Sequence, residues 1–246
     1  MTFRALSWNI HKGIGGVDRR YRPERILEVL LHYEPDLVML QEVDEGSRRS
    51  RFHRQVDLIG EALQMEYRCY APNVRLRSKG HYGNATLARW PCIDAHNIDL
   101  TIRPKKRRGA LYAKFRIRHE KRTRTMAVFN FHLGLAGFER RLQIKRFLNS
   151  HPFAHFHTRT PVIVGGDLND LWGSLGRRYL EPAGFRRAGR LMNTYPAVFP
   201  ARPLDGLFVH GDLSVRRCFR SRVGVAREAS DHLPLIADLE LGWTPP

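Results

Sequence analysis

The sequence has few cysteines, no long apolar segment and no recognisable secretory signal. Cys69, Cys92 and Cys218 are odd in number and far apart, and none belongs to a CxxC or paired Cys/His pattern. Neither a disulfide framework nor a structural zinc site is therefore indicated. No apolar stretch approaches the roughly 18 residues that a membrane span needs. The segment MTFRALSWNI alternates like a strand and lacks the basic and apolar regions of a signal peptide. We expect a cytoplasmic chain without a transmembrane segment.

The chain also lacks the features that separate domains. Its 246 residues contain no long tract rich in proline, serine or glycine. They contain no repeat with a period of about 20 to 50 residues. With 42% hydrophobic residues, the chain can bury a substantial core. We predict one domain that spans residues 1–246.

Acidic residues are scarce relative to basic ones. The chain has 42 lysines and arginines against 24 aspartates and glutamates, which gives a formal net charge of +18. Such an excess raises the local concentration of polyanions and speeds their encounter with the protein. We expect nucleic acid as the partner, with an anionic membrane surface as the alternative. The sequence does not predict an oligomeric state.

Apolar patterns predict strands that alternate with helices. Helices are predicted at residues 23–33, 55–63 and 138–149. Pro23 lies in the first turn of the first helix. Strands are predicted at residues 3–10, 36–43, 83–89, 110–118, 125–133, 161–169, 204–209 and 233–241.

This order of elements predicts the class of fold. The strands in the middle of the chain have period two, which indicates antiparallel hairpins. Together with apolar runs too long for a sheet with one buried face, they predict an α/β fold of four layers. In this four-layer α/β sandwich, two packed, mainly antiparallel sheets are flanked by helices. A Rossmann-type fold fits less well, because hairpins occur where βαβ units are required.

Polar side chains stand at the ends of several predicted strands. Asn9 ends the first strand and Glu42 ends the second, and side chains from strand ends gather at one rim of a sheet. Asn130 and His132 are two residues apart on one strand, so they share a face. Taken singly, each has a structural explanation as a turn former, a strand terminus or a hydrogen-bonded histidine. Their combination with later motifs decides between the two interpretations.

Two acidic motifs follow in the second half of the chain. VIVGGDLND places Asp167 and Asn169 after an apolar strand and two glycines that permit a ligand to approach the backbone. A carboxylate there can hold or deprotonate water; an Asx turn is the structural alternative. SDHLPL places Asp231 and His232 before the last strand, and Asp205 on a neighbouring strand can orient the His232 ring. A turn with a surface histidine is the alternative.

Seven segments between residues 7 and 235 carry a family resemblance. They are SWNIHKG, LQEVD, GHYGNATLAR, NFHLG, GGDLND, LDGLFV and SDHLPL. In this order they closely resemble the endonuclease/exonuclease/phosphatase superfamily, whose fold is deoxyribonuclease I-like. The chain looks most like the small bacterial members called metal-dependent hydrolases. Each motif alone is weak, but seven together leave little room for coincidence.

The resemblance implies a phosphoester hydrolase that uses Mg²⁺ or Mn²⁺. Glu42 matches the main metal ligand of the family, and Asn9 matches its companion at the metal or the phosphate. Asp231 would be a second metal contact or would orient a ring. These oxygen ligands suit hard cations. Asp167 matches the residue that orients or activates the attacking water, and Asn169 matches the donor that stabilises the pentacovalent transition state.

The remaining matches concern the phosphate. His232 matches the histidine that contacts the phosphate or acts as a base, and Asp205 matches its orienting partner. By the same matching, His132 would be a phosphate ligand or a general acid to the leaving oxygen. Asn84 and Asn130 would contact the phosphate. Positioning and charge neutralisation of this kind are the main requirements of phosphoryl transfer.

The resemblance defines the reaction better than the substrate. LQEV, where abasic-site endonucleases usually have LQET, favours the branch with deoxyribonuclease I, sphingomyelinases, inositol-polyphosphate phosphatases and tyrosyl-DNA phosphodiesterases. Dense basic runs favour nucleic acid, and therefore a nuclease. The candidate polyanion-binding residues are Lys105, Lys106, Arg107 and Arg108, although an exposed turn is their structural alternative.

Two other functions remain open. One is hydrolysis of an anionic phospholipid or a small phosphoester, with basic clusters that dock the protein on a membrane. The other is a catalytically inactive nucleic-acid-binding module. The second is disfavoured, because a protein that only binds has no need to keep the whole set of matched catalytic residues.

Overall fold

Two mixed sheets of six strands each form the centre of the protein, in a computed structural model that describes residues 1–243. The strands of the first sheet lie in the order β11 (Leu213–Arg220), β12 (Leu235–Leu241), β1 (Thr2–Asn9), β2 (Leu37–Glu45), β4 (His81–Ala88) and β3 (Tyr67–Arg75). Those of the second lie in the order β5 (Cys92–Asp99), β6 (Gly109–His119), β7 (Arg122–His132), β8 (Val162–Asp167), β10 (Asp205–His210) and β9 (Arg186–Arg187). Each sheet has one parallel pair, β1 with β2 and β7 with β8.

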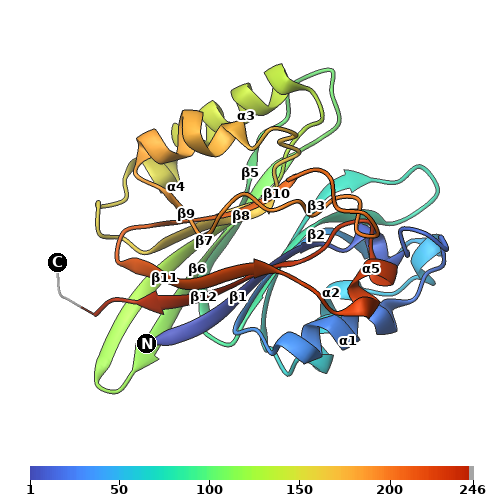
Figure 1. Cartoon of the computed structure of the whole chain (residues 1–246), viewed down its shortest axis with the longest axis horizontal. Helices are drawn as coiled ribbons and strands as arrows, with labels where there is room; N and C mark the ends of the chain where they lie inside the picture. The colour runs from blue at the N-terminus through green and yellow to red at the C-terminus, as the bar shows by residue number, and fades with distance from the viewer. Residues whose placement is uncertain (244–246) are drawn as a thin grey trace.

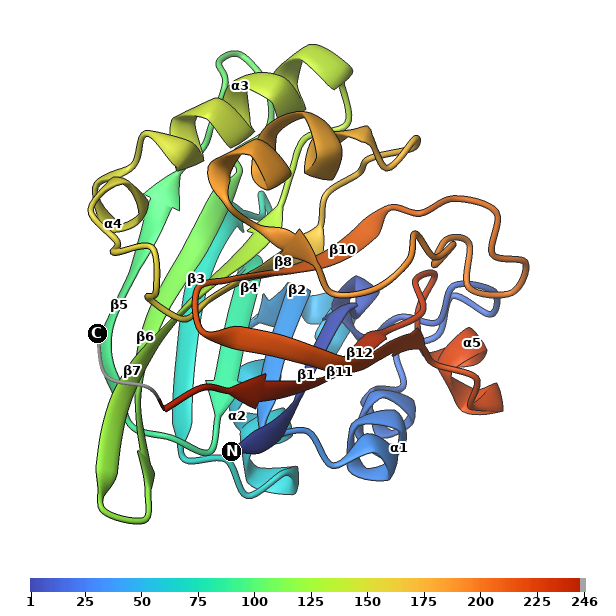
Figure 2. The same cartoon turned by 60° about the vertical axis from the view of Figure 1, so that its left-hand side comes forward.

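Helices cover the outer face of each sheet. The first sheet is covered by α1 (Pro23–Tyr33), α2 (Gln55–Ala62) and α5 (Gly224–Ala229). The second is covered by α3 (Gly137–Leu148), α4 (His151–Ala154) and a π-helix (Gly176–Leu180). Short 3₁₀-helices lie at His11–Gly13, Arg48–Ser50 and Glu181–Ala183. Figure 1 shows the two groups of helices on either side of the strands, and Figure 2 shows the same layers after a 60° turn.

This arrangement confirms the predicted four-layer α/β sandwich. Apolar side chains from alternate strand positions fill the space between the sheets; Met39 and Ala237 belong to this core together with Phe115 and Val128. The sheets are mainly antiparallel, as expected, with the two parallel pairs as the exception. No helix within residues 1–243 is long and apolar enough to cross a membrane. The predicted domain extends to residues 244–246, which lie outside the described part, and its being a single domain stays a prediction.

The first helix explains how two strands end at the same edge. Pro23 occupies the start of α1, where its missing N–H costs no helical hydrogen bond. Ile26, Val29 and Leu30 are buried against the first sheet. The helix ends at Tyr33, and the next residue, Glu34, has a left-handed φ of 46°. Because α1 returns the chain to the starting edge, β2 runs parallel to β1, and Asn9 pairs with Gln41.

The second sheet brings its polar strand ends to the same region. In the parallel pairing of β7 with β8, His132 lies beside Asp167. In the antiparallel pairing of β10 with β8, Asp205 lies on the other side of Asp167. Three titratable side chains from three strands therefore meet at one level of the sheet, before any loop is considered.

Candidate active site

The polar ends of the strands line a pocket of about 420 Å³. Seven of the eight residues that the sequence predicted as catalytic or metal-binding line it, and the eighth, Asp205, lies directly behind His232. The pocket is lined by Asn9, His11, Lys12, Glu42, Lys106, Arg108, His132, Leu135, Asp167, Asn169, Leu171, Tyr195, Leu204, Asp231 and His232.

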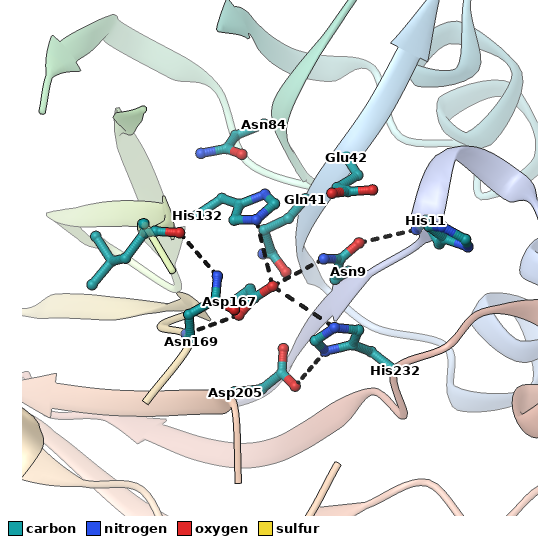
Figure 3. Close-up of polar contacts among 12 residues, drawn as sticks. Asn9, His11, Gln41, Glu42, Asn84, His132, Asp167, Asn169, Asp205 and His232 are labelled. Atoms are coloured by element: carbon teal, nitrogen blue, oxygen red, sulfur yellow. Dashed lines mark hydrogen bonds and ion pairs between the residues drawn. The ribbon is translucent and has the colours of Figure 1, made fainter. Parts of the chain in front are cut away.

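Asp167 lies at the centre of the polar contacts (Figure 3). Its Oδ2 accepts a hydrogen bond from Asn9 Nδ2 at 3.0 Å, and its Oδ1 accepts one from the Asn169 backbone N–H at 2.9 Å. On the remaining sides, His132 Nε2 lies 3.6 Å and His232 Nε2 3.8 Å from Oδ2. The carboxylate is 2% exposed. It is therefore fixed in one orientation, with two imidazoles beside the same oxygen.

His232 is held from behind by an acid. Its Nδ1 lies 2.8 Å from Asp205 Oδ2, the arrangement that the sequence suggested. The Thr194 hydroxyl donates to the same carboxylate oxygen, and Trp8 Nε1 donates to the His232 carbonyl oxygen at 2.7 Å. These contacts fix the ring so that its other nitrogen, Nε2, faces Asp167 and the pocket.

The two histidines differ in charge at neutral pH. Burial alone lowers the pKa of His232, but the carboxylates of Asp205 and Asp167 raise it to about 10. Burial lowers the pKa of His132 well below its ordinary value. Burial also raises the pKa of Asp167 to about 6. The site therefore combines a cationic histidine, a neutral histidine and a carboxylate that can take up a proton, which is the pattern of an acid–base site.

Glu42 enters the pocket through an irregularity in its strand. The pairing of β2 with β4 shifts register between Leu40 and Val43, and Glu42 has a φ of 55°. A bulge of this kind turns a side chain away from the regular strand direction. Burial alone would raise the pKa of Glu42, but its neighbours His132 and Lys12 lower it to about 2. Lys12 Nζ donates to Glu42 Oε2. The carboxylate is thus ionised at neutral pH.

The donors around Glu42 fit a hard divalent cation. Glu42 and Asp231 offer carboxylate oxygens and Asn9 offers an amide oxygen, all in the same pocket. Mg²⁺ and Mn²⁺ prefer such oxygen ligands. Asn9 Oδ1 accepts the His11 backbone N–H at 3.0 Å, which fixes the amide so that its oxygen has one further lone pair for a ligand.

A second group of side chains can also hold a metal ion. Asp167, Asp205 and His232 have ligand atoms that all lie within 4.8 Å of one another, and all three are buried. However, His232 Nδ1 and Asp205 Oδ2 already bond to each other. The Glu42 group, with its free carboxylate oxygen and its opening to the pocket, is the better match to a cation that must also meet a substrate.

Comparison with known proteins decides the family. A sequence model of the Endonuclease/Exonuclease/phosphatase family matches residues 6–232. The chain belongs to this family. Its members include phosphodiesterases and nucleases, and every catalytic and metal-binding residue predicted from the sequence lies within the matched range. The uncharacterized protein YbhP of Escherichia coli strain K12 is 30% identical, in a match that covers 98% of this chain and 97% of that protein.

Solved structures of the family share the fold. An endonuclease/exonuclease/phosphatase from Beutenbergia cavernae superposes with a TM-score of 0.81 at 23% identity, over 98% of this chain and 72% of the other. The human Nocturnin catalytic domain with bound sulfate gives 0.72 at 21%, over 98% and 94%. Truncated Caenorhabditis elegans TDP2 gives 0.70 at 19%, over 97% of each chain. The deoxyribonuclease I-like fold inferred from the motifs is confirmed.

The two asparagines that were predicted to contact phosphate, Asn84 and Asn130, lie behind the pocket and not in it. Asn130 is fully buried; its Nδ2 donates to Leu40 O and Ala85 O at 2.9 Å each, and its Oδ1 accepts from Gln41 Nε2 at 2.7 Å. Asn84 is 1% exposed, and its Nδ2 donates to the Asn130 carbonyl oxygen at 2.9 Å. Neither side chain lines the pocket. Both instead join the two sheets behind it.

Replacing Asn130 with leucine should destabilise the protein by about 2–4 kcal/mol, because two carbonyl oxygens and the Gln41 amide would each lose a hydrogen bond inside the core. The measurement is urea-induced unfolding. Asn97→Leu is the control, since Asn97 is exposed on β5 and its side chain bonds, within residues 1–243, to Asn73 alone. Equal unfolding free energies for the two variants would contradict the joining role of Asn130.

Only alternate residues of the predicted basic run at 105–108 line the pocket. Lys106 and Arg108 line the pocket, whereas Lys105 and Arg107 do not. Arg108 is 8% exposed, and its Nε has no hydrogen-bond partner among the described residues. Lys106 Nζ lies 5.0 Å from the centroid of the Tyr82 ring. Half of the run is therefore aimed at the site, and the other half faces solvent.

The variant Lys106→Gln/Arg108→Gln should flatten the salt dependence of oligonucleotide binding by about one slope unit for each phosphate contact that is lost. The matched variant Lys105→Gln/Arg107→Gln, which removes the same charge outside the pocket, should leave the slope nearly unchanged. Binding of a fluorescent oligonucleotide at increasing NaCl measures both. If the two variants behave alike, the run is an ordinary solvated turn.

Three other basic runs, at residues 48–54, 121–124 and 216–222, each have an arginine that is paired with an acid of the fold. Arg49 is bidentate to the buried Asp44, at 2.9 Å for both bonds. Arg217 pairs with Asp238 at 3.0 Å. Arg124 likewise pairs with Asp212 at 2.6 Å. These arginines stabilise the fold, so the net charge overstates the number of cations that a polyanion can reach.

Sequence reasoning missed six residues that line the pocket, three of them polar. His11 and Lys12 lie in the 3₁₀-helix directly after Asn9, within the SWNIHKG motif. Their place next to a matched family residue was a signal that could have found them. Tyr195, whose ring lies 5.0 Å from the His232 ring, comes from an irregular segment without any such signal.

Proposed function

We propose that the chain is a phosphodiesterase that depends on a divalent metal ion. The observation that carries this proposal is the position of Asp167, a buried carboxylate with two imidazoles beside one oxygen and an ionised Glu42 in the same pocket. A cation, a proton acceptor and fixed hydrogen-bond donors are what phosphoryl transfer requires. Membership of the family supports the same reaction class.

Each side chain has a role in the proposed hydrolysis. Asp167 orients a water molecule and accepts its proton as the water oxygen bonds to phosphorus. The bond from phosphorus to the leaving oxygen breaks, and that oxygen takes up a proton, so a diester and water give a monoester and an alcohol. His232, kept cationic by Asp205, stabilises the charge on the phosphate, while His132 hydrogen-bonds to it. Asn169, whose Nδ2 donates to Leu133 O at 2.9 Å, has a second amide hydrogen for the transition state.

The metal-binding role belongs to Glu42, with Asn9 and Asp231 as further oxygen ligands. When bound there, Mg²⁺ or Mn²⁺ would neutralise phosphate charge as a Lewis acid. Lys12, which contacts Glu42, neutralises the carboxylate when no cation is present. An inactive binding module would have no use for this complete set, and its presence in one pocket therefore supports an enzyme.

Two substrate classes are candidates. The net charge of +18 and the pocket-facing Lys106 and Arg108 favour nucleic acid, and therefore a nuclease. The apolar side chains at the mouth of the pocket favour an anionic phospholipid. The test is hydrolysis of single- and double-stranded DNA, RNA, anionic vesicles and a chromogenic phosphodiester at fixed salt. Cleavage should require metal and should be roughly 10³-fold slower in Asp167→Asn; silence on every substrate would contradict the proposal.

A further inference from the structure

Exposed apolar side chains are concentrated around the mouth of the pocket. Leu135 and Leu171 line the pocket and are 74% and 40% exposed. Trp172, which is 75% exposed, follows Leu171, and Phe138 lies three residues after Leu135 at the start of α3. Large apolar side chains in contact with water in one region mark a surface that meets another molecule.

Exposed apolar side chains also lie beyond Asp231, on another side of the pocket. Asp231 lines both the active-site pocket and a small neighbouring cavity, and Val198 lines that cavity too. Phe199, which follows Val198, is 79% exposed. We call the following six residues the apolar rim: Leu135, Phe138, Leu171, Trp172, Val198 and Phe199.

Cations lie among the side chains of the apolar rim. Lys105 Nζ lies 6.0 Å from the centroid of the Phe138 ring, and the Arg202 guanidinium lies 6.0 Å from that of Trp172. Both cations are exposed. A surface of apolar side chains with lysine and arginine beside them matches the interface of an anionic bilayer, where apolar groups enter the lipid and cations meet the head groups. Tryptophan is itself enriched at that interface.

We propose that the apolar rim is a docking surface for an anionic phospholipid bilayer, and that it brings the phosphodiester of a lipid head group to the pocket. This inference rests on the proposed phosphodiesterase function and names the substrate class of the same site. Charge complementarity supports it, because the rim carries Lys105 and Arg202, and the pocket behind it contains Lys106 and Arg108.

The rim is a weaker match to nucleic acid. Bases stack on aromatic rings, but only half of the rim, Phe138, Trp172 and Phe199, offers a ring. A strand of nucleic acid also needs a track of available cations beyond the pocket. Arg49 and Arg217, from two of the basic runs, are instead paired with acids of the fold. Nucleic acid is therefore an outcome of the test rather than the proposal.

Vesicle binding tests the docking surface without catalysis. The full chain carrying Asp167→Asn, which slows hydrolysis, is sedimented with vesicles of phosphatidylcholine alone or mixed with phosphatidylglycerol. We expect binding to the mixed vesicles and little to phosphatidylcholine alone. Adding Trp172→Ser/Phe199→Ser should weaken binding by roughly tenfold or more. The control Leu31→Ser/Ile93→Ser removes two exposed apolar side chains of α1 and β5, outside the rim, and should bind like its parent.

Hydrolysis by the otherwise wild-type chain separates this inference from the proposed function. Trp172 and Phe199 do not line the pocket, so Trp172→Ser/Phe199→Ser should cleave a soluble chromogenic phosphodiester at the wild-type rate but release less phosphorylated head group or lipid from anionic vesicles. Thermal melting checks that the variant is folded. Absence of vesicle binding, equal binding by rim and control variants, or a rim effect on oligonucleotide cleavage alone would overturn the docking surface. If the wild-type chain does not hydrolyse the chromogenic phosphodiester, the proposed phosphodiesterase function itself is wrong.

Discussion

The Asp167→Asn variant should hydrolyse phosphodiesters roughly 10³-fold more slowly than the wild type, the order of a general-base contribution, and should remain folded. Asparagine has the size of aspartate, and its one oxygen can accept either the Asn9 amide or the Asn169 backbone N–H. It cannot take a proton from water. The measurement is the initial rate on a chromogenic phosphodiester at saturating metal, with circular dichroism to verify the fold.

A nearby aspartate provides the matched control. Asp170 is also buried, but its carboxylate accepts the Leu175 backbone N–H at 2.6 Å and does not line the pocket. Asp170→Asn therefore makes the same substitution outside the pocket, and this variant should retain most of the activity. A rate for Asp167→Asn within tenfold of the wild type would remove Asp167 from its role with the attacking water.

Glu42→Gln should abolish turnover because it weakens the binding of the metal ion. Glutamine keeps the shape of the side chain but removes the negative charge that the lowered pKa of Glu42 maintains at neutral pH. Loss of a residue that only orients a metal ligand costs roughly 10–100-fold in metal affinity. Loss of the ligand charge itself should cost at least as much. Isothermal titration with Mn²⁺ measures the affinity independently of activity.

The control for this change lies three residues further along β2. Glu45 pairs with Arg54 at 2.9 Å on the surface, so Glu45→Gln removes one charge from the same strand without reaching the pocket. It should bind Mn²⁺ as the wild type does. If Glu42→Gln also keeps its metal affinity and its metal-dependent rate, Glu42 is not the ligand.

The elements that carry the site could be predicted from the sequence because their patterns are strong. The spacing of Ile26 and Leu30 after Pro23 in α1 reflects burial on one face, which the structure confirms. The apolar residues of β1 fill both faces of a buried strand. The same holds for the apolar run of β8 that ends at Asp167. Since strand ends gather at one edge of a sheet, the polar residues after these strands could be grouped before any coordinates were known.

Elements without a buried face left no such pattern. β5 has mostly exposed side chains, so its residues do not alternate between apolar and polar, and the sequence did not predict it as a separate strand. In β11 a register shift occurs between Val215 and Arg217. Its arginines, which pair with acids on β12, form a dense basic stretch in the sequence that lacks the alternation of a strand.

Within the site, the sequence predicted which residues lie on the same face of a strand, but not what each of those residues contacts. Asn130 and His132 do lie on the same side of β7, yet His132 faces the pocket and Asn130 faces the other sheet. The distinction depends on where the two sheets separate, which no local pattern encodes. Lys12 was missed for a similar reason, because its contact with Glu42 depends on the irregularity in β2 that turns the glutamate toward it.

Removal and restoration of the metal ion test the central claim most directly. Wild-type protein is treated with EDTA, assayed on a chromogenic phosphodiester, and assayed again after Mg²⁺ or Mn²⁺ is added in excess. A phosphodiesterase with a metal ion at Glu42 should lose hydrolysis with EDTA and recover it with either cation, and Glu42→Gln should not recover. Hydrolysis that persists in EDTA, or no hydrolysis with any metal, would contradict the account.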